Sequence, residues 1–307
     1  MNGSMAAGLF QQDWWLQASG GKDLERVEVK WDGEVVAALC FVRKRFCGMR
    51  VIKLPPYTRT HGPMLSLPVS KPAKHTQNLH RAVRCLIENL PKHDRFHLLL
   101  DPEDPTAFPF AMAGCLIEQA FTFRLPAHTD LDQYWENLHQ KTRNLIRSAA
   151  KKLVVHASSD TEILLDMSAR EHHPKRNIHN FDAMRRIARE SSTRGQSTVL
   201  LVKDDDGKVV ASTLLVWDDA ILYFWQSSRD PHTVVPGANS LLVWEAIKFA
   251  LNKNLTFDFD GSHSHGAAQF AVKFGIDAVA RPSVIHMSTM GMIAQKAALQ
   301  FGWKPNA

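Results

Sequence analysis

Cysteine is scarce in this chain of 307 residues and occurs at Cys40, Cys47, Cys85 and Cys115. No two of these residues form a C-x-x-C pair, and their spacing matches no zinc site, so we expect no metal centre built on cysteine. Most have apolar neighbours, which is typical of buried, reduced thiols. Reduced thiols indicate a reducing compartment, and the sequence therefore predicts a cytoplasmic protein.

Long apolar segments are also missing. No run reaches the length of about 18 apolar residues that a helix needs to span a bilayer. The first residues lack a basic segment followed by an apolar core, so no signal peptide is expected. We therefore expect no membrane span.

The composition is otherwise ordinary for a globular protein, with 45% hydrophobic and 22% charged residues. The length fits one large domain or two domains of about 150 residues each. A net charge of +6 favours a polyanionic partner such as a phosphate-rich cofactor or RNA. This charge falls well short of that of a histone-like protein, and we expect no DNA partner.

Strand and helix periodicities alternate in the first part of the chain. A turn at Asp32-Gly33 separates the first two expected strands. Strands are expected at 26–30, 35–43, 49–54 and 96–101, helices at 74–90 and 108–119, and a last strand that ends near Leu125. The stretch Pro126–Asp130 marks the expected boundary between domains 1–126 and 127–307.

The second part begins with helices and continues with an antiparallel meander. Thr129 or Asp130 is placed to cap its first helix. The later elements are helices at 142–152 and 180–192, strands at 198–203, 209–217 and 221–228, a helix at 240–252, a strand at 256–260, a helix at 267–274 and a strand at 283–288. This order of elements predicts an α+β fold.

A glycine-containing loop opens the expected helix that follows the meander. It contains Gly237, Ala238, Asn239 and Ser240. Free backbone N–H groups at a helix start attract phosphate, and a glycine allows a ligand to approach the backbone. A plain helix start, capped by Asn239 or Ser240, is the alternative interpretation.

Two carboxylates follow each other at the end of the strand at 256–260. Strand alternation places Asp258 and Asp260 on one face, with Phe257 and Phe259 on the other. Two neighbouring carboxylates can share a proton, and one of them can deprotonate an attacking amine. The alternative is that both accept backbone hydrogen bonds in the following turn.

Basic and imidazole side chains form two further patterns. Arg143, Arg147 and Lys151 recur every four residues and share one face of a helix, which suits phosphates of RNA or of a nucleotide-linked substrate. An ordinary basic surface helix is the alternative. His263 and His265 form an H-x-H pair without an obvious third ligand, so no metal site is predicted.

Together these segments resemble the FemAB-like branch of the GNAT superfamily. The matching motifs are Leu9–Leu16, Pro55–Pro63, Lys141–Ala149, Gly237–Trp244, Phe257–Ser262 and Phe270–Gly275. The resemblance implies two tandem GNAT-like domains, with mixed, mostly antiparallel sheets flanked by helices. It also implies an N-acyltransferase that moves an acyl group to an amine of a small molecule or cell-envelope precursor. The donor would be acyl-CoA or an aminoacyl-tRNA, used as a co-substrate and not as a tightly bound cofactor.

The resemblance assigns roles to residues. Asp258 and Asp260 are expected to be catalytic. The expected donor-binding residues are Gln226, Gly237, Ala238, Asn239, Ser240, Ser262, Phe270 and Lys273. The expected contacts to the acceptor or to RNA are Tyr57, Arg59, His61, Arg143 and Arg147. Many relatives have a large residue where this chain has Ala271, which favours the alternative of an inactive ligand- or RNA-binding protein with the same fold.

Overall fold

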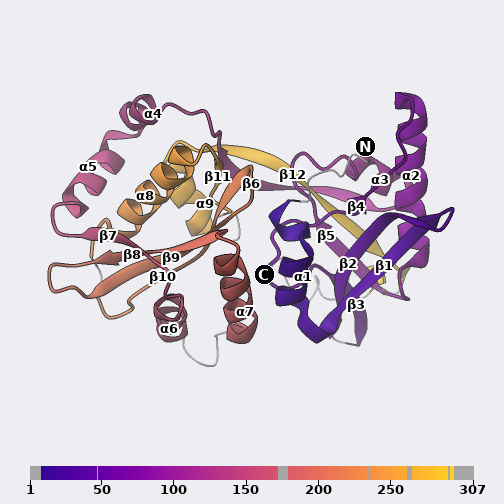
Figure 1. Cartoon of the computed structure of the whole chain (residues 1–307), viewed down its shortest axis with the longest axis horizontal. Coiled ribbons are helices and arrows are strands. Elements are labelled where there is room, and N and C mark those ends of the chain that lie inside the picture. The colour runs from indigo at the N-terminus through magenta and orange to yellow at the C-terminus, as the bar shows by residue number, and fades with distance from the viewer. Residues whose placement is uncertain are drawn as a thin grey trace. The chain divides into compact units, whose positions relative to one another are not determined.

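The computed structural model describes residues 8–46, 48–171, 179–233, 235–260, 265–289 and 291–293 (Figure 1). The chain forms two compact units. Unit 1 contains residues 1–120 and 280–307, and unit 2 contains residues 121–279. These units differ from the expected domains 1–126 and 127–307 in the last strand, most of which belongs to unit 1.

Unit 1 is built on a mixed sheet with the strand order β1-β2-β3-β5-β12. Strands β3 and β5 are parallel, and the other neighbours in this order are antiparallel. Asp32 and Gly33 both have positive φ at the β1–β2 turn, which confirms the expected hairpin. The strands are β1 (Leu24–Trp31), β2 (Glu34–Phe46), β3 (Met49–Lys53), β5 (Arg95–Leu99) and β12 (Asp277–Met287), and β4 (Met64–Leu65) pairs with β2.

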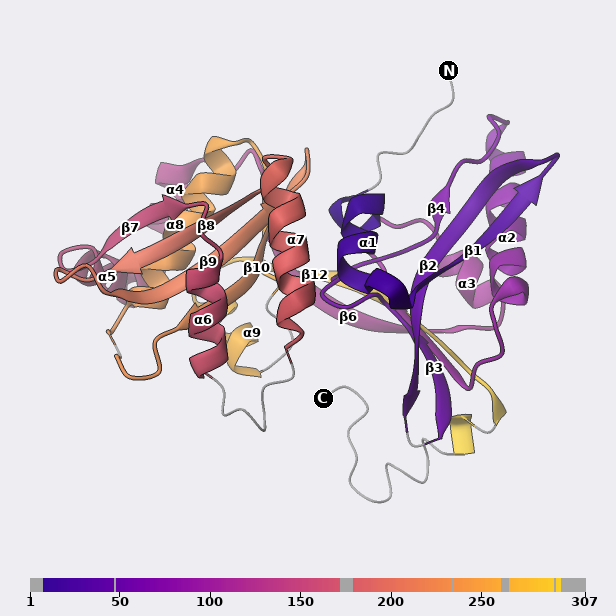
Figure 2. The ribbon, with the colours of Figure 1, turned by 60° about the horizontal axis from the view of Figure 1, so that its bottom comes forward.

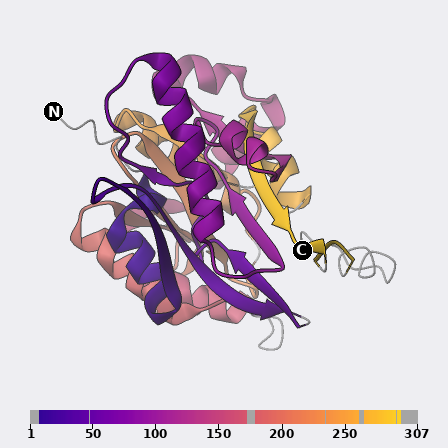
Figure 3. The same cartoon turned by 90° about the vertical axis from the view of Figure 1, so that its right-hand side faces the viewer.

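The helices of unit 1 bury an apolar face against this sheet. Figure 3 turns unit 1 towards the viewer and shows α2 lying across the strands. Ala82, Val83 and Leu86 of α2 belong to the same buried cluster as Phe96 and Leu98 of β5. The helical elements are η1 (Leu9–Gln11), α1 (Asp13–Gly20), η2 (Gly21–Asp23), α2 (Pro72–Asn89) and α3 (Ala107–Met112).

Unit 2 has the strand order β6-β11-β10-β9-β8-β7. The strands β7 to β10 form an antiparallel meander, and β10 is parallel to β11. The strands are β6 (Leu116–Leu125), β7 (Val154–Ser158), β8 (Ser197–Lys203), β9 (Val209–Trp217), β10 (Ile221–Arg229) and β11 (Thr256–Asp258). The expected meander is therefore confirmed.

Helices cover both faces of the sheet in unit 2, as Figure 2 shows for α8 on one face and α6 on the other. Leu200 and Val202 of β8 belong to the buried cluster that includes α8, whereas Ser212 contacts Met167 of α6. The helices are α4 (Leu131–Asn137), α5 (Gln140–Ala149), α6 (Glu162–Glu171), α7 (Phe181–Thr193), α8 (Ala238–Asn252) and α9 (His265–Val272). No helix among the described residues has both the length and the apolarity of a membrane-crossing segment.

Several element boundaries differ from the expectation. The helix expected at 108–119 ends at Met112, because Gly114 adopts φ +90 and the Cys115 N–H donates to the Phe110 carbonyl. Residues from Leu116 onward are therefore strand β6. Strand β7 and helix α6 were not expected, and β12 begins at Asp277 instead of residue 283.

The two units share a β-α-β arrangement but fill it differently. In unit 1 it is β3-α2-β5, and in unit 2 it is β10-α8-β11. In unit 1, the loop 54–63 joins the end of β5, because the His61 N–H donates to the Leu99 carbonyl at 2.8 Å. The Trp15 indole also donates to Thr58 Oγ1 at 3.2 Å. A Cβ at Gly62 would lie 1.8 Å from Asp104 Oδ2, so a side chain there would require Asp104 to move.

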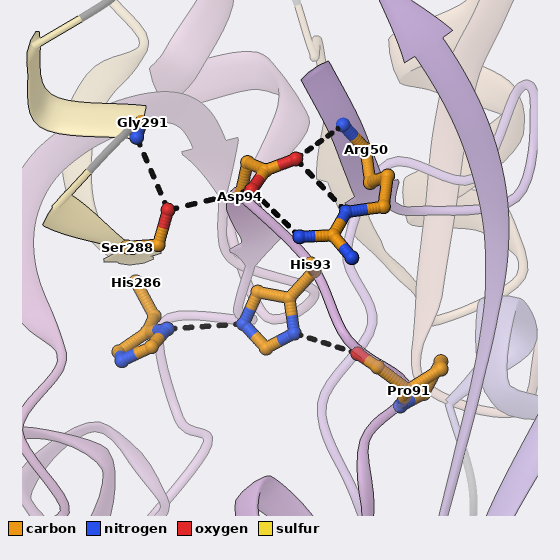
Figure 4. A network of polar contacts seen from close by, with 7 residues as sticks. All are labelled: Arg50, Pro91, His93, Asp94, His286, Ser288 and Gly291. Carbon is orange, nitrogen blue, oxygen red and sulfur yellow. Dashed lines mark hydrogen bonds and ion pairs between the residues drawn. The ribbon is translucent and has the colours of Figure 1, made fainter. Parts of the chain in front are cut away.

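A polar network fixes the end of β12 within unit 1 (Figure 4). Arg50 binds both carboxylate oxygens of Asp94 at 2.9 and 3.0 Å, which lowers the pKa of Asp94. The Asp94 carbonyl accepts from the Ser288 N–H at 3.1 Å. His93 Nδ1 lies 2.9 Å from the Pro91 carbonyl, which can only accept, so the other nitrogen of a neutral His93 accepts from His286 at 3.0 Å. The network connects β3, the start of β5 and the end of β12.

Two histidines, one buried and one half-buried, predict a pH dependence of unit 1. Burial lowers the pKa of His61 and of His97 to about 4. Both are neutral in the folded state, whereas an unfolded chain binds protons below about pH 6.5. The free energy of unfolding is therefore highest above about pH 6.5. It decreases as the pH falls towards 4, by up to about 3 kcal/mol for each residue.

We expect His97→Gln to reduce this pH dependence, measured as the difference in free energy of unfolding between pH 7 and pH 4.5. His75→Gln, on the exposed face of α2, is the matched control for the substitution of a histidine. An equal pH dependence in the wild type and in His97→Gln would contradict the assignment.

Candidate functional site

The parallel strands β10 and β11 separate after a short paired segment. Their pairing runs from Ile221–Tyr223 against Thr256–Asp258, but β10 continues to Arg229. The register between β10 and β9 shifts between Phe224 and Gln226, so a β-bulge lies at this point of β10. On the other side, the Phe259 N–H donates to the Phe123 carbonyl of β6 at 2.9 Å. The main chains of β10 and β11 thus diverge at the carboxyl ends of both strands.

Helix α8 begins at the same end of the sheet. It connects β10 to the parallel strand β11, so its first turn must lie beyond the carboxyl ends of both strands. Its N-cap is Gly237, at φ +86, and no side chain caps the helix. The first-turn N–H groups and the helix dipole therefore favour an anion at this position.

The glycine at the start of α8 has a structural role. A Cβ on Gly237 would lie 2.9 Å from Ala149 Cβ and 2.9 Å from the Leu145 carbonyl oxygen, both on α5. Ala238 and Ser240 are buried, whereas Asn239 is exposed. Of the four residues proposed from this loop, only the Asn239 side chain faces outward, and the requirement for glycine comes from α5.

Asp258 lies at the end of β11 among polar side chains of β6. Its Oδ1 accepts from Thr122 Oγ1 at 2.5 Å, and its Oδ2 accepts from Arg124 Nε at 2.8 Å. Asp258 is 2% exposed. Burial raises the pKa of Asp258, while the positive charge of Arg124 offsets part of that increase.

Asp260 follows two residues later in an unusual backbone conformation. Its φ is +49, in the left-handed region that non-glycine residues avoid. The Asp260 N–H donates to Asp258 Oδ1 at 2.9 Å. A hydrogen bond from the backbone amide of Asp260 to the carboxylate of Asp258 therefore joins the two residues that were predicted to be catalytic.

The remaining donor-binding candidates fall into three groups. Gln226 lies at the bulge, and its carbonyl accepts from Thr213 Oγ1 at 2.8 Å. Phe270 packs in an aromatic series with Phe259 and Phe274 and contributes apolar packing. Lys273 is exposed on the turn after α9. Ser262 lies outside the described residues.

Ala271 is fully buried in the core of unit 2. A large polar residue at this position would have to enter the core instead of reaching a ligand. The small side chain is therefore explained by packing, and it gives no support to the alternative of an inactive protein.

Helix α5 and the loop 54–63 also carry residues that were predicted to contact the acceptor or RNA. Helix α5 ends at Ala149, so Lys151 lies beyond the helix that was expected to present it. Arg143 forms an ion pair with Glu136, and Arg147 lies over the Trp135 ring at 5.3 Å. Arg143 and Arg147 of α5 are therefore engaged with α4.

The predicted contact residues Tyr57, Arg59 and His61 lie in the loop 54–63 of unit 1. His61 is 1% exposed and lies in the interior, so its ring cannot contact a surface ligand. Tyr57, at φ +62, and Arg59 are half-buried. Tyr57 and Arg59 thus remain as candidates for ligand contact.

No metal centre is found in the part of the chain that the structure describes. There, no group of three His, Cys, Asp or Glu side chains is placed to hold an ion. His265 begins α9, and His263 lies outside the described residues.

Thr122 and Arg124 were not predicted as functional residues. They precede Asp258 by 136 and 134 residues, and only the pairing of β6 with β11 brings them to it. A polar residue at every second position of an apolar strand, as in Phe121–Leu125, was the available signal.

Comparison with known proteins supports the architecture. Residues 135–270, less than half of the chain, match the family model described as an acetyltransferase (GNAT) domain. No curated protein matches the chain by sequence.

Three solved structures share the fold at low sequence identity. FemX has a TM-score of 0.65 and 13% identity, with 94% of each chain covered. L-PGS from Bacillus licheniformis has a TM-score of 0.58 and 12% identity, with 93% of this chain and 90% of that chain covered. A tandem GNAT protein from the clavulanic acid biosynthesis pathway has a TM-score of 0.52 and 12% identity, with 86% and 82% covered. These likenesses confirm the expected α+β fold, with mixed, mostly antiparallel sheets flanked by helices.

We expect Gly237→Ala to destabilise unit 2 through two effects. The positive φ costs about 1 kcal/mol for alanine, and the overlap with α5 adds about 1–3 kcal/mol. Gly195→Ala is the matched control, because Gly195 has φ +66 and no atom within 4 Å of its Cβ position. Urea denaturation of both variants separates the effects, and equal losses of stability would show that α5 does not restrict position 237.

Proposed function

We propose, because residues 135–270 match the family model described as an acetyltransferase (GNAT) domain, that the chain is an N-acyltransferase that moves an acyl group from acyl-CoA to an amine. The observation that carries the proposal is the divergence of β10 and β11 beside the uncapped start of α8. A strand that leaves its neighbour can pair its backbone groups with an extended ligand that contains amides. The helix start favours the phosphates of the same ligand.

The arrangement of α5 favours acyl-CoA over aminoacyl-tRNA as the donor. RNA binding depends on cations that are available to phosphates along an extended surface. Arg143 and Arg147 are instead engaged with Glu136 and Trp135 of α4. A compact polyanion at α8 requires fewer free cations than tRNA does.

The chemistry that we propose needs no covalent enzyme intermediate. Backbone N–H groups near the bulge of β10 would polarise the donor carbonyl and stabilise the oxyanion that forms on attack. The amine forms the new C–N bond, the C–S bond of the donor breaks, and CoA leaves as a thiolate. A carboxylate at the end of β11 accepts the amine proton. The acceptor is an amine of a small molecule or of a cell-envelope precursor.

Unit 1 is proposed to hold no second donor. Its own β-α-β arrangement is filled by the loop 54–63, which bonds to Leu99 at the end of β5. The donor position of unit 2 therefore has no open counterpart in unit 1.

We expect one acetyl-CoA to bind per chain, measured by isothermal titration calorimetry. At about 100 times the dissociation constant, binding would stabilise the fold by about 2.7 kcal/mol and raise the melting temperature by about 5 °C. Two bound molecules per chain would contradict the role of the loop 54–63. No shift with acetyl-CoA, beside salt-sensitive binding of charged tRNA, would reject acyl-CoA as the donor.

Asn239→Asp is expected to separate stability from donor binding. A negative charge in the first turn of α8 favours the helix dipole and should slightly raise the melting temperature of the free protein. The same charge repels donor phosphates and should weaken acetyl-CoA binding about fivefold to tenfold. Asn252→Asp, at the exposed end of the same helix, is the control and should leave affinity unchanged. An unchanged affinity in Asn239→Asp would place the phosphates elsewhere.

A further inference from the structure

We propose that unit 1 binds a phosphate group on the face of its sheet opposite to α2, between Lys53 of β3 and Arg95 of β5, with His97 and Ser283 as further donors. All four residues belong to unit 1, so the proposal concerns this unit alone. It does not rest on the proposed function, because neither acyl transfer nor the position of the donor enters it. None of the four was predicted from the sequence to be a site residue.

A buried cluster shows which face of the sheet is turned towards α2. This cluster joins the helix to one residue each of β3, β5 and β12, namely Ile52, Phe96 and Val284. Side chains alternate along a strand, so the residues next to these three point to the other face. Lys53, Arg95, His97 and Ser283 are such residues, and they therefore share the face opposite to α2.

The strand register also places the four residues close together. Lys53 is directly opposite His97 in the parallel pair of β3 and β5, and neighbouring strands lie about 4.8 Å apart. Arg95 precedes His97 by two residues, or about 7 Å along the strand. Ser283 Oγ lies 3.0 Å from His97 Nε2. The imidazole of His97 therefore has two cationic side chains and one hydroxyl around it.

The two cations of this site have no carboxylate partner. Neither β3 nor β5 contains an acidic residue. In the part of the chain that the structure describes, no ion pair is found for Lys53 or for Arg95. Two neighbouring positive charges repel each other, so an anion that binds between them is stabilised by both. Three other cations of β2 and β3 do have partners, in the ion pairs Arg43–Glu25, Lys44–Asp23 and Arg50–Asp94.

The pKa of His97 reflects the same excess of positive charge. Burial, followed by the charges of Arg95 and Lys53, lowers it to about 4. The imidazole is therefore neutral at pH 7, and its Nδ1 has no hydrogen-bond partner among the described residues. Arg281 of β12 lies on the same face, but it is 3% exposed and has interactions of its own. A bound anion would offset the repulsion and raise the pKa of His97.

The donors suit a phosphate group better than a carboxylate. A guanidinium donates in a fork to two phosphate oxygens, and an ammonium group can donate to a third. A phosphate monoester has three terminal oxygens and a charge of about −2, whereas a carboxylate has two oxygens and a single charge. Ser283 is 7% exposed and Lys53 is exposed, so the donors extend from the interior to the surface.

The measurement is NMR of the histidine ring protons during titration with inorganic phosphate, at an ionic strength held constant with chloride. The signal of His97 is identified by its absence from His97→Gln. Phosphate should raise the pKa of His97, so between about pH 5 and pH 7 its signal should move towards that of the charged ring. Glycerol 3-phosphate, titrated in parallel, distinguishes the sources: binding of both probes assigns the site to phosphate esters, and binding of inorganic phosphate alone assigns it to the free ion.

Lys53→Met and Arg95→Met should each weaken phosphate binding about fivefold to tenfold, because each removes one charged donor. Lys30→Met, on β1, is the matched control for the loss of one exposed positive charge and should stay within about twofold of the wild type. Lys53→Met should also raise the pKa of His97 in the free protein, since one repelling charge is gone, and reduce the further rise caused by phosphate.

A His97 signal that phosphate does not move in the wild type would overturn the proposal. Equal weakening in Lys30→Met and Lys53→Met would overturn it as well, because it would show a general effect of net charge. Acetate should bind more weakly than phosphate, and equal affinity for the two would contradict the assignment to phosphate. If Arg95→Met does not fold, Lys53→Met decides, because Lys53 is exposed.

Discussion

The buried ion pair between Arg124 and Asp258 is the interaction on which the candidate site depends. It joins β6 to β11 at 2.8 Å, at the last paired residue of β11. Removing one partner of such a pair costs about 3–5 kcal/mol, because the other charge stays buried. The pair therefore fixes where β11 ends and where the chain turns away from β10. The carboxylate at residue 260 and the gap beside the start of α8 both follow from that point.

The two units show how one arrangement can be used in two ways. In each unit a helix joins two parallel strands, and these two strands separate at their carboxyl ends. In unit 1 the loop 54–63 occupies this position and is bound through His61 N–H and Thr58. In unit 1, His97 Nε2 lies 3.0 Å from Ser283 Oγ. In the strand register, His97 corresponds to Asp258 of unit 2, and Ser283 corresponds to Thr122. Only unit 2 has a carboxylate at this position.

Much of the fold is predictable from local sequence, whereas the site depends on contacts between distant residues. The meander, helix α8 and the Asp130 cap of α4 follow from alternation and from capping chemistry, and the structure confirms them. Thr122 and Arg124 reach Asp258 only through strand pairing, which no local pattern specifies. Gly237 looked like a ligand-binding glycine, but the close approach of α5 requires it. Ala271 looked like a lost ligand contact, but it faces the core.

We propose that the acyl donor lies where β10 leaves β11. The most direct measurement is the change in amide hydrogen exchange along the chain on saturation with acetyl-CoA. We expect slower exchange at the β10 segment from Gln226 to Arg229 and in the first turn of α8, with unit 1 unchanged. Protection confined to the loop 54–63 or to α2, with β10 and α8 unaffected, would contradict it.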